Sequence, residues 1–380
     1  MPTQRKIVYL SGTRADFGLM QSTLLLIDGD PRFDLGIAVT GMHLDPVYGD
    51  TVQDIEATGL KIAARIPCDV QSRSEAGMAL SIGQTIAGLV QLFSVKKPDI
   101  LLLLGDRGEM LAGAVAAMHF GIIIVHIHGG ERSGTIDESI RHAISKISHY
   151  HLTSTQDAKT RLERMGEIPE HICVSGAPGL DGIVQLSATL TRSNLSAYTG
   201  LPDDVPFVLC LFHPVVQQSD DAFVQTLALR AALLHIGLPV LWMSSNSDAG
   251  ANEILRAVSL QPLPAGSVHI AHLSRAAFCA AMRLCAVMVG NSSAGIIEAA
   301  SFSTRVVNIG NRQYARIRSN NVIDVDPSQV AISLGLQIAL ATGQHQFENK
   351  YGDGEAGIKI VNYLAVLSLD KIVLEKSNAY

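Results

Sequence analysis

The fold class follows from residues 122–142, which run Ile122-Ile-Ile-Ile-Val-His126-Ile-His-Gly-Gly-Glu131-Arg-Ser-Gly-Thr-Ile-Asp-Glu-Ser-Ile-Arg-His142. The apolar run at the start predicts a buried parallel strand, because such strands are covered on both faces. The chain then breaks at Gly129-Gly130, and a helix is expected from about residue 136. In α/β folds such a turn lies at the carboxyl edge of the sheet, where ligands bind.

This turn is unusually rich in ionisable side chains. A packed core has no use for so many of them, because each needs a partner or water. A cleft in which protons move does need them. The sequence therefore predicts an active site here, with these candidates: His128, Glu131, Asp137, Glu138, Arg141 and His142.

Apolar runs alternate with helical patterns along the rest of the chain, as in successive βαβ units. Strands are expected at residues 6–10, 34–39, 99–104, 122–127, 150–153 and 171–174, and again at 207–211, 240–243, 268–271, 287–289 and 306–309. Helices between them include 75–93 and 109–120. We therefore predict two Rossmann-like α/β/α domains with an interdomain cleft. The expected boundaries are 1–178, an irregular linker at 179–205, 206–355, and a final helical segment at 356–380.

Composition narrows the class of protein. The chain has 380 residues, of which 47% are hydrophobic and 17% charged, and its net charge is −6. These values indicate a well-folded globular protein and argue against a nucleic-acid surface. The longest apolar run, 111–127, changes from Ala-rich to Ile-rich sequence, which predicts a helix and a strand and no membrane span. A first strand at residue 6 leaves no room for a signal peptide, and five cysteines without a CxxC pair predict a cytoplasmic protein.

Two turns in the first half carry candidate ligands. Residues 11–18, Ser-Gly-Thr-Arg-Ala-Asp-Phe-Gly, are not a GxGxxG motif, so no dinucleotide cofactor is expected. Arg14 could hold an anion there, or the turn could be a plain helix cap with a solvated arginine. Asp106 and Arg107 follow a buried strand, so Asp106 is either a catalytic carboxylate beside an anion-binding arginine or a helix N-cap.

Histidines give a weaker signal. His126 and His128 are two residues apart and could share a face, as could His149 and His151. A metal site needs a third or fourth converging ligand, which this spacing does not supply, so no metal is expected. His213 follows a strand and is either a donor to a phosphate or sugar, or a turn residue.

The strongest anion signal lies in the second half, at Gly290-Asn-Ser-Ser-Ala-Gly295. Small residues let the backbone approach a diphosphate, and a helix N-terminus offers free N–H groups. Ser292 and Ser293 add hydroxyl donors, and Glu298 could accept hydrogen bonds from ribose. Arg312, in the next turn, could neutralise the same diphosphate. A capped tight turn is the alternative.

Together these segments resemble the hydrolysing UDP-N-acetylglucosamine 2-epimerases of the bacterial sialic-acid pathway. The resemblance spans nearly the whole chain, through Gly12-Thr-Arg-Ala-Asp16, Gly105-Asp-Arg107, residues 126–146, Gly290-Asn-Ser-Ser293 and Asn308-Ile-Gly-Asn-Arg-Gln313. It implies a fold like that of GT-B glycosyltransferases, a last helix crossing back to the first domain, and a homodimer.

The resemblance also implies residue roles. Asp106, Glu131 and Glu138 match the proton-transfer set, with His128 and Asp137 beside them. Matches to nucleotide-diphosphate ligands are Arg14, Arg107, His213, Asn246, Ser292, Ser293, Glu298 and Arg312. Sugar-side candidates are His43, Arg141 and His142. Some relatives carry Glu where His128 stands, so the principal base is left open.

The implied reaction is conversion of UDP-N-acetylglucosamine and water to N-acetylmannosamine and UDP, by anti elimination to 2-acetamidoglucal and then water addition. The alternative is the same reaction on UDP-2,4-diacetamido-2,4,6-trideoxyglucose, the legionaminic-acid precursor, or on a GDP sugar. Two remoter alternatives are a GT-B glycosyltransferase and a nucleotide-sugar sensor that binds without turnover.

Overall fold

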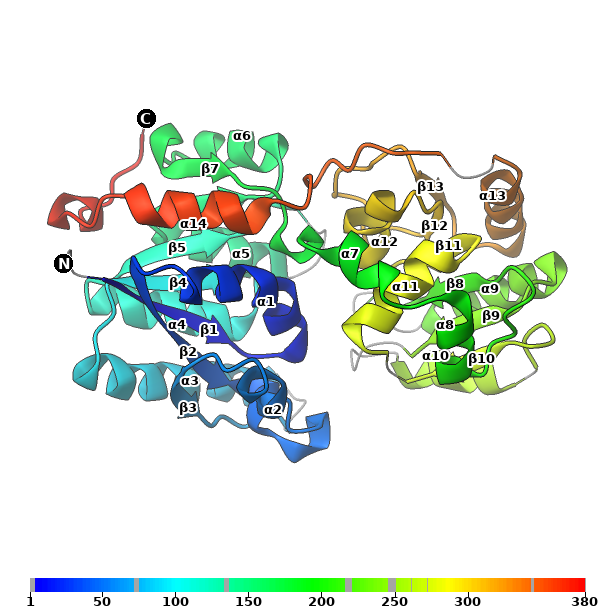
Figure 1. Ribbon diagram of the computed structural model, residues 1–380, viewed down its shortest axis with the longest axis horizontal. Helices are drawn as coiled ribbons and strands as arrows, with labels where there is room; N and C mark the ends of the chain where they lie inside the picture. Colours follow the sequence, from blue (N-terminus) through cyan, green and yellow to red (C-terminus); the bar gives the residue numbers. More distant parts are fainter. Residues whose placement is uncertain are drawn as a thin grey trace. The chain divides into compact units, whose positions relative to one another are not determined.

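The computed structural model describes residues 4–71, 75–132, 137–215, 221–244, 251–260, 262–271, 273–342 and 345–379. The chain divides into a first unit, Met1–Asp181 with Tyr351–Tyr380, and a second unit, Gly182–Lys350 (Figure 1). Each unit contains one parallel β-sheet with helices connecting its strands. This confirms the predicted class of two Rossmann-like α/β units.

The first unit has a seven-stranded sheet in the order β3-β2-β1-β4-β5-β6-β7. The order runs outward in two directions from β1 and β4, so the topological switch point lies between these two strands. The strands are β1 (Arg5–Ser11), β2 (Phe33–Thr40), β3 (Ile62–Ile66), β4 (Ile100–Leu104), β5 (Ile123–Ile127), β6 (Tyr150–Thr153) and β7 (Ile172–Val174).

Helices cover both faces of this sheet. They are α1 (Arg14–Asp28), α2 (Val52–Glu56), α3 (Glu75–Val95), α4 (Gly108–His119), α5 (Asp137–Ile147), α6 (Gln156–Arg164) and α14 (Ala356–Val366), with short 3-10 helices η1 (Gly41–Leu44), η2 (Pro46–Tyr48), η3 (Pro169–His171), η4 (Pro178–Leu180) and η7 (Lys371–Leu374). Successive β1 residues alternate between two cores: Tyr9 packs with α1 and α14, and Leu10 packs with α3 and α4. Burial on both faces explains why the central strands are mostly apolar.

The second unit has a six-stranded sheet in the order β10-β9-β8-β11-β12-β13, with its switch point between β8 and β11. Its strands are β8 (Val208–Leu211), β9 (Val240–Met243), β10 (Val268–Ile270), β11 (Val287–Gly290), β12 (Val306–Ile309) and β13 (Val322–Val325). Its helices are α7 (Ile183–Ala188), α8 (Arg192–Thr199), α9 (Ala222–Ile236), α10 (Ala251–Ser259), α11 (Arg275–Leu284), α12 (Ser293–Ile297), α13 (Gln329–Ala341) and the 3-10 helix η6 (Ala299–Phe302).

The segment predicted as an irregular linker, 179–205, is ordered. It forms η4, α7 and α8, and both α-helices pack against α11 in the second unit. Leu195 of α8 is fully buried, and Arg283 donates to the carbonyls of Ser187 and Leu190 at 3.1 and 2.8 Å. The linker prediction was wrong because a few buried apolar residues and a capping box at Thr191 suffice to fix two short helices here.

The chain returns to the first unit at Tyr351. Asp181 caps the start of α14, since its carboxylate accepts the backbone N–H groups of Ala356, at 2.9 Å, and of Gly357. The helix then packs along α1 (Figure 1). Its Ile360 and Leu364 are completely buried in the core above β1.

Among the described residues, one helix is long and apolar enough to cross a membrane by length and composition, the segment Ala76–Val95 of α3. In this structure α3 packs against α4, and its Leu89 and Phe93 belong to the core of the first unit.

Candidate active site

The acid-rich turn is held together by a buried arginine. Arg141, on α5, is 3% exposed, and its guanidinium forms an ion pair with Asp106 in the turn after β4. The same guanidinium donates to the main-chain carbonyl of Glu131 at 3.0 Å. Arg141 thus links the turns that follow β4 and β5 at the carboxyl edge of the sheet. A buried guanidinium with several acceptors fixes geometry, because few other arrangements satisfy its donors.

Asp106 is a partner of this arginine and does not cap a helix. The N-cap of α4 is Arg107, one residue later, and its side chain makes no capping hydrogen bond. Arg107 pairs instead with Glu109, with Nε and Oε2 3.3 Å apart. The alternative reading of Asp106 as an N-cap is therefore wrong.

Glu131, in the turn after β5, is buried, with 5% of its surface exposed. One of its carboxylate oxygens accepts the hydroxyl of Ser154 and lies 3.6 Å from Nδ1 of His128. His128 has a left-handed backbone with φ of 64°, and Gly130 has φ of 73°, with a Cβ there falling 2.4 Å from the Ala158 carbonyl oxygen. This tight turn places His128 over Glu131 and requires glycine at position 130.

A second carboxylate group lies on α5. Glu138 approaches His142 one turn later, at 3.6 Å, and Arg132 at 3.8 Å. Burial lowers the pKa of His142, while the nearby Glu138 carboxylate acts in the opposite direction. Asp137 is the first residue of α5, and its side chain lies outside the described residues.

His126 is a structural residue and not a partner of His128. It is fully buried, with Nε2 2.7 Å from the Gly105 carbonyl and Nδ1 3.1 Å from the Ser145 hydroxyl. A carbonyl only accepts, so Nε2 carries the proton and Nδ1 accepts from the hydroxyl. Burial lowers the pKa of His126 to about 3, which keeps the ring neutral.

The turn after β1 is a capped helix start. Thr13 and Asp16 form a capping box at the N-terminus of α1. The Asp16 carboxylate accepts from Thr13 N at 2.8 Å, from Gly12 N at 3.1 Å and from the Ser11 hydroxyl. Burial raises its pKa to about 6, although these hydrogen bonds act to lower it. Arg14 is half-exposed and pairs with Asp54 at 3.3 Å.

His43, expected to face the sugar, is completely buried. Its Nε2 lies 2.9 Å from the Ser11 hydroxyl and its Nδ1 2.8 Å from the Thr51 hydroxyl. Both ring nitrogens are therefore occupied by the protein, and His43 braces the turn after β1. Asp16, Asp45 and Glu109 are buried carboxylates of this region, and the sequence patterns did not identify them as site residues.

In the second unit, Asn291 organises the switch point. Its side-chain oxygen accepts His213 N at 2.7 Å, and its amide nitrogen donates to His213 O at 2.8 Å. Its own carbonyl accepts from Arg312 at 3.2 Å and from Gln313 at 3.1 Å. Asn291 therefore joins three segments carrying predicted ligands. It was overlooked as a separate residue because its amide acts on backbone, not on a ligand.

The predicted diphosphate ligands lie around this asparagine. Ser292 caps α12 through a 3.4 Å contact with Ala294 N, and Ser293 is the first residue of that helix. A Cβ at Gly290 would fall 1.7 Å from the Leu211 carbonyl oxygen, so only glycine fits where β11 meets β8. Burial, assisted by Arg312, lowers the pKa of His213 to about 3, so it can act as a neutral donor or acceptor.

Two further nucleotide ligands were predicted, Glu298 and Asn246, and only Glu298 is among the described residues. Glu298 is 6% exposed and pairs with Arg275, with carboxylate oxygens 3.1 and 3.2 Å from Nη1. It stands at the C-cap of α12. Asn246 lies outside the described residues. In the described part of the chain, no group of three His, Cys, Asp or Glu side chains could hold a metal ion.

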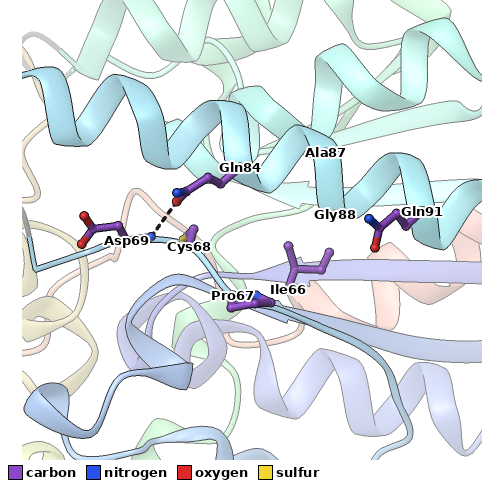
Figure 2. A pocket seen from close by; sticks show the side chains of 8 residues that line it. All are labelled: Ile66, Pro67, Cys68, Asp69, Gln84, Ala87, Gly88 and Gln91. Atoms are coloured by element: carbon purple, nitrogen blue, oxygen red, sulfur yellow. Dashed lines mark hydrogen bonds between the residues drawn. The ribbon is translucent and has the colours of Figure 1, made fainter.

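A separate cavity of about 460 Å³ opens between the end of β3 and α3 (Figure 2). It is lined by Ile66, Pro67, Cys68, Asp69, Gln84, Ala87, Gly88 and Gln91. Gln84 accepts the Asp69 N–H at 2.7 Å across its mouth, as Figure 2 shows. The strand β3 is at the edge of the sheet, and none of the predicted site residues lines this cavity.

Known proteins share both the sequence and the fold. The family profile described as UDP-N-acetylglucosamine 2-epimerase matches residues 26–365. A Legionella pneumophila protein named UDP-N,N'-diacetylbacillosamine 2-epimerase (hydrolyzing) is 46% identical over 99% of this chain and 100% of its own. A Neisseria meningitidis UDP-N-acetylglucosamine 2-epimerase is 31% identical, covering 96% of this chain and 95% of its own.

The solved structure of UDP-GlcNAc 2-epimerase from Neisseria meningitidis bound to UDP-GlcNAc superposes with a TM-score of 0.80 at 17% identity, over 94% of this chain and 99% of that one. This likeness confirms the GT-B-like fold. The resemblance inferred from the motifs is confirmed by the family profile and by the relatives that match almost end to end. The chain belongs to the UDP-N-acetylglucosamine 2-epimerase family.

Proposed function

We propose that this protein is a hydrolysing nucleotide-sugar 2-epimerase whose preferred substrate is UDP-N,N'-diacetylbacillosamine, that is, UDP-2,4-diacetamido-2,4,6-trideoxyglucose. The observation that carries the substrate is the 46% identity, along 99% of the chain, to the Legionella pneumophila protein named for it. The relative named for UDP-N-acetylglucosamine is 31% identical. The comparison therefore reverses the order of the two substrates suggested by the motifs.

The geometry of the first unit supports the chemistry. The C2 proton of a pyranose is not next to a carbonyl, so its removal has to accompany loss of the anomeric diphosphate. Three carboxylates lie near one edge of the sheet, those of Asp106, Glu131 and Glu138. Arg141 holds the turn of Asp106 against the turn of Glu131. Inversion at C2 needs proton transfer on two faces of the ring. Several carboxylates together with His128 meet that requirement.

The proposed reaction has two steps, an elimination and an addition of water. A carboxylate removes H2 as the C1–O bond to the diphosphate breaks, which gives UDP and a C1=C2 glycal. Water then adds its oxygen to C1, and a proton is delivered to C2 on the opposite face. The net reaction consumes one water and releases UDP and the free 2-epimer. Both catalytic protons are exchanged between substrate, water and side chains, so no cofactor is required.

The second unit supplies groups suited to the nucleotide diphosphate. Arg312 and the N–H groups at the start of α12 are donors, and Ser292 and Ser293 add hydroxyls. Donors placed where negative charge develops on a leaving group stabilise the transition state. Glu298, held by Arg275, keeps a fixed carboxylate for ribose hydroxyls.

The test is incubation with the diacetamido UDP sugar, UDP-N-acetylglucosamine and a GDP sugar, each in D₂O without an acceptor, followed by proton NMR. We expect UDP release and a product deuterated at C2, with kcat/KM highest for the diacetamido sugar. A parallel incubation includes a sugar acceptor: UDP release only in its presence would identify a glycosyltransferase, and binding without turnover in either would identify a sensor. A preference for UDP-N-acetylglucosamine would restore the sialic-acid assignment.

We also propose that the enzyme works as a homodimer in the cytoplasm. All five cysteines are free thiols, which fits the reducing environment of the cytoplasm.

The homodimer is tested separately. Light scattering on a size-exclusion column measures the mass directly, and the mass of a single chain would contradict the dimer.

A further inference from the structure

Residues 376–379 are attached to the first unit by hydrogen bonds and by a cluster of charged side chains. After α14 the chain passes through η7 and reaches Lys376, whose side chain is 19% exposed. Figure 1 shows this segment leaving α14 and ending beside α6. Ala379 N donates to the Gly166 carbonyl at 2.9 Å, just beyond the end of α6.

The centre of the cluster is Glu167, which is 2% exposed. Its carboxylate lies 2.5 Å from Lys376 Nζ, 2.8 Å from Lys146 Nζ and 2.8 Å from Nε2 of His151. Burial alone would raise the pKa of Glu167, but these donors lower it to about 2. Glu167 is therefore a permanent anion that needs its cations, and removing one of them leaves buried charge poorly compensated.

Lys376 also binds the C-terminal end of α5. Lys376 Nζ donates to the carbonyl of Ser145 at 3.1 Å and to that of Ser148 at 2.5 Å, which lie at the C-terminus of this helix. A lysine there donates to carbonyls of the last turn and is attracted by the negative end of the helix dipole. Lys146, in the last turn, also donates to the Asn378 side chain at 2.7 Å.

The helix held in this way carries the proton-transfer region. One turn before Ser145, Arg141 binds Asp106 and the Glu131 carbonyl. The Ser145 hydroxyl contacts His126, which in turn donates to the carbonyl of Gly105, the residue before Asp106. Two routes of direct contact therefore run from the end of α5 to Asp106.

We propose that residues 370–379 form a strap that holds α5 in place, and that Lys376 is a positioning residue for Asp106 and Glu131. Lys376 acts through the helix and does not touch the substrate. The strap deepens the proposed function, on which it rests. Small displacements of catalytic groups lower turnover strongly even when substrate still binds.

The test compares Lys376→Met with Lys371→Met, which removes an exposed lysine from η7 in the same segment. We expect kcat to fall by about tenfold or more in Lys376→Met, with KM changed by less than about twofold. Lys371→Met should match the wild type. Lys376→Arg keeps the charge and the donors, so it should recover most of the turnover. Equal kcat in all variants, or equal losses at both lysines, would overturn the proposal.

Hydrogen exchange provides a readout that does not depend on turnover. Amides of residues 140–147 should exchange at least about fivefold faster in Lys376→Met, while those of α14 stay unchanged. Wild-type protein that turns over no sugar contradicts the proposed function, whereas unchanged exchange in α5 contradicts the strap. Where Lys376→Met does not fold, deletion of residues 377–380 keeps Lys376 and removes the Asn378 and Ala379 contacts. This deletion should speed α5 exchange too, and wild-type rates would contradict the strap.

Discussion

At the scale of single residues, the carboxylates of the first unit give the most direct prediction. Glu131→Gln and Asp106→Asn keep nearly the same shape and remove the capacity to accept a proton. A positioned general base contributes about 10²–10⁴-fold, so we expect kcat to fall at least about 10²-fold in either variant. The rate of UDP release measures this, with Glu163→Gln on α6 as the control. Ordinary activity in the double variant would refute these roles.

The side chain of Asn291 holds the backbone of His213 in place. Asn291→Ala leaves the backbone N–H and C=O of His213 without their partners, which costs about 1–3 kcal/mol when such groups are buried. We expect a lower free energy of unfolding and a KM for the UDP sugar raised about tenfold, because His213 loses its support. The main-chain carbonyl that binds Arg312 is retained in this variant. The exposed Asn311→Ala in the neighbouring loop is the matched control. An unchanged KM in Asn291→Ala would separate this asparagine from the nucleotide.

At the scale of elements, the caps of two helices differ in a way that can be tested. Asp181 accepts two backbone N–H groups of α14, whereas Asp221 stands at the N-cap of α9 and its side chain makes no capping hydrogen bond among the described residues. Asp181→Ala should lower the free energy of unfolding by about 1–2 kcal/mol, and Asp221→Ala by less than about 0.5 kcal/mol. Urea titration followed by circular dichroism gives both values. Equal losses would mean that the cap on α14 is not a stabilising contact.

The elements also show what sequence patterns can and cannot reveal. Buried strands such as β4 and β5 were predictable because both faces are covered and all their residues but His126 are apolar. The edge strands β3 and β13 were not predicted, since each is only partly buried and carries a charged residue, Arg65 or Asp324. Likewise α7 and α8 were taken for a linker because both are short and α8 is mostly polar.

Within the site, sequence identified residue types but not their partners. Asp106 and Glu131 could be selected from their place after apolar strands, yet nothing local shows that Arg141 binds Asp106, which is 35 positions away. His43 was assigned to the sugar through the family resemblance. Only the packing shows that Ser11 and Thr51 occupy both of its nitrogens.

Buried histidines make the stability of the protein depend on pH. The pKa values of His126 and His213 fall to about 3 and that of His149 to about 4, chiefly through burial. The unfolded chain, with histidine pKa values near 6.5, then binds more protons than the native state, so stability is lost as pH falls from about 6.5 towards 3. Asp16, with a raised pKa of about 6, acts oppositely and loses stability as pH rises through that value.

The expected net effect is a marked decrease in the free energy of unfolding between pH 7 and pH 5, of which His126 alone accounts for about 2 kcal/mol. Urea titrations at both pH values measure it. The variant His126→Gln should be less stable at pH 7 but less sensitive to pH, and the exposed His119→Gln should keep the wild-type dependence. A wild-type curve that is flat over this range would show that these histidines are protonated in the native protein.

The return of the chain to its first unit sets an order for biosynthesis. Residues 182–350 are contiguous, so the ribosome releases everything that the second unit needs before α14 has been made. Until then, the apolar surface that α14 covers on β1 and α1 stays open to water or to a chaperone, and α5 lacks Lys376. The unit that was translated first is therefore the unit that is completed last, and the acid-rich turn lacks its full support until α14 and Lys376 have been made.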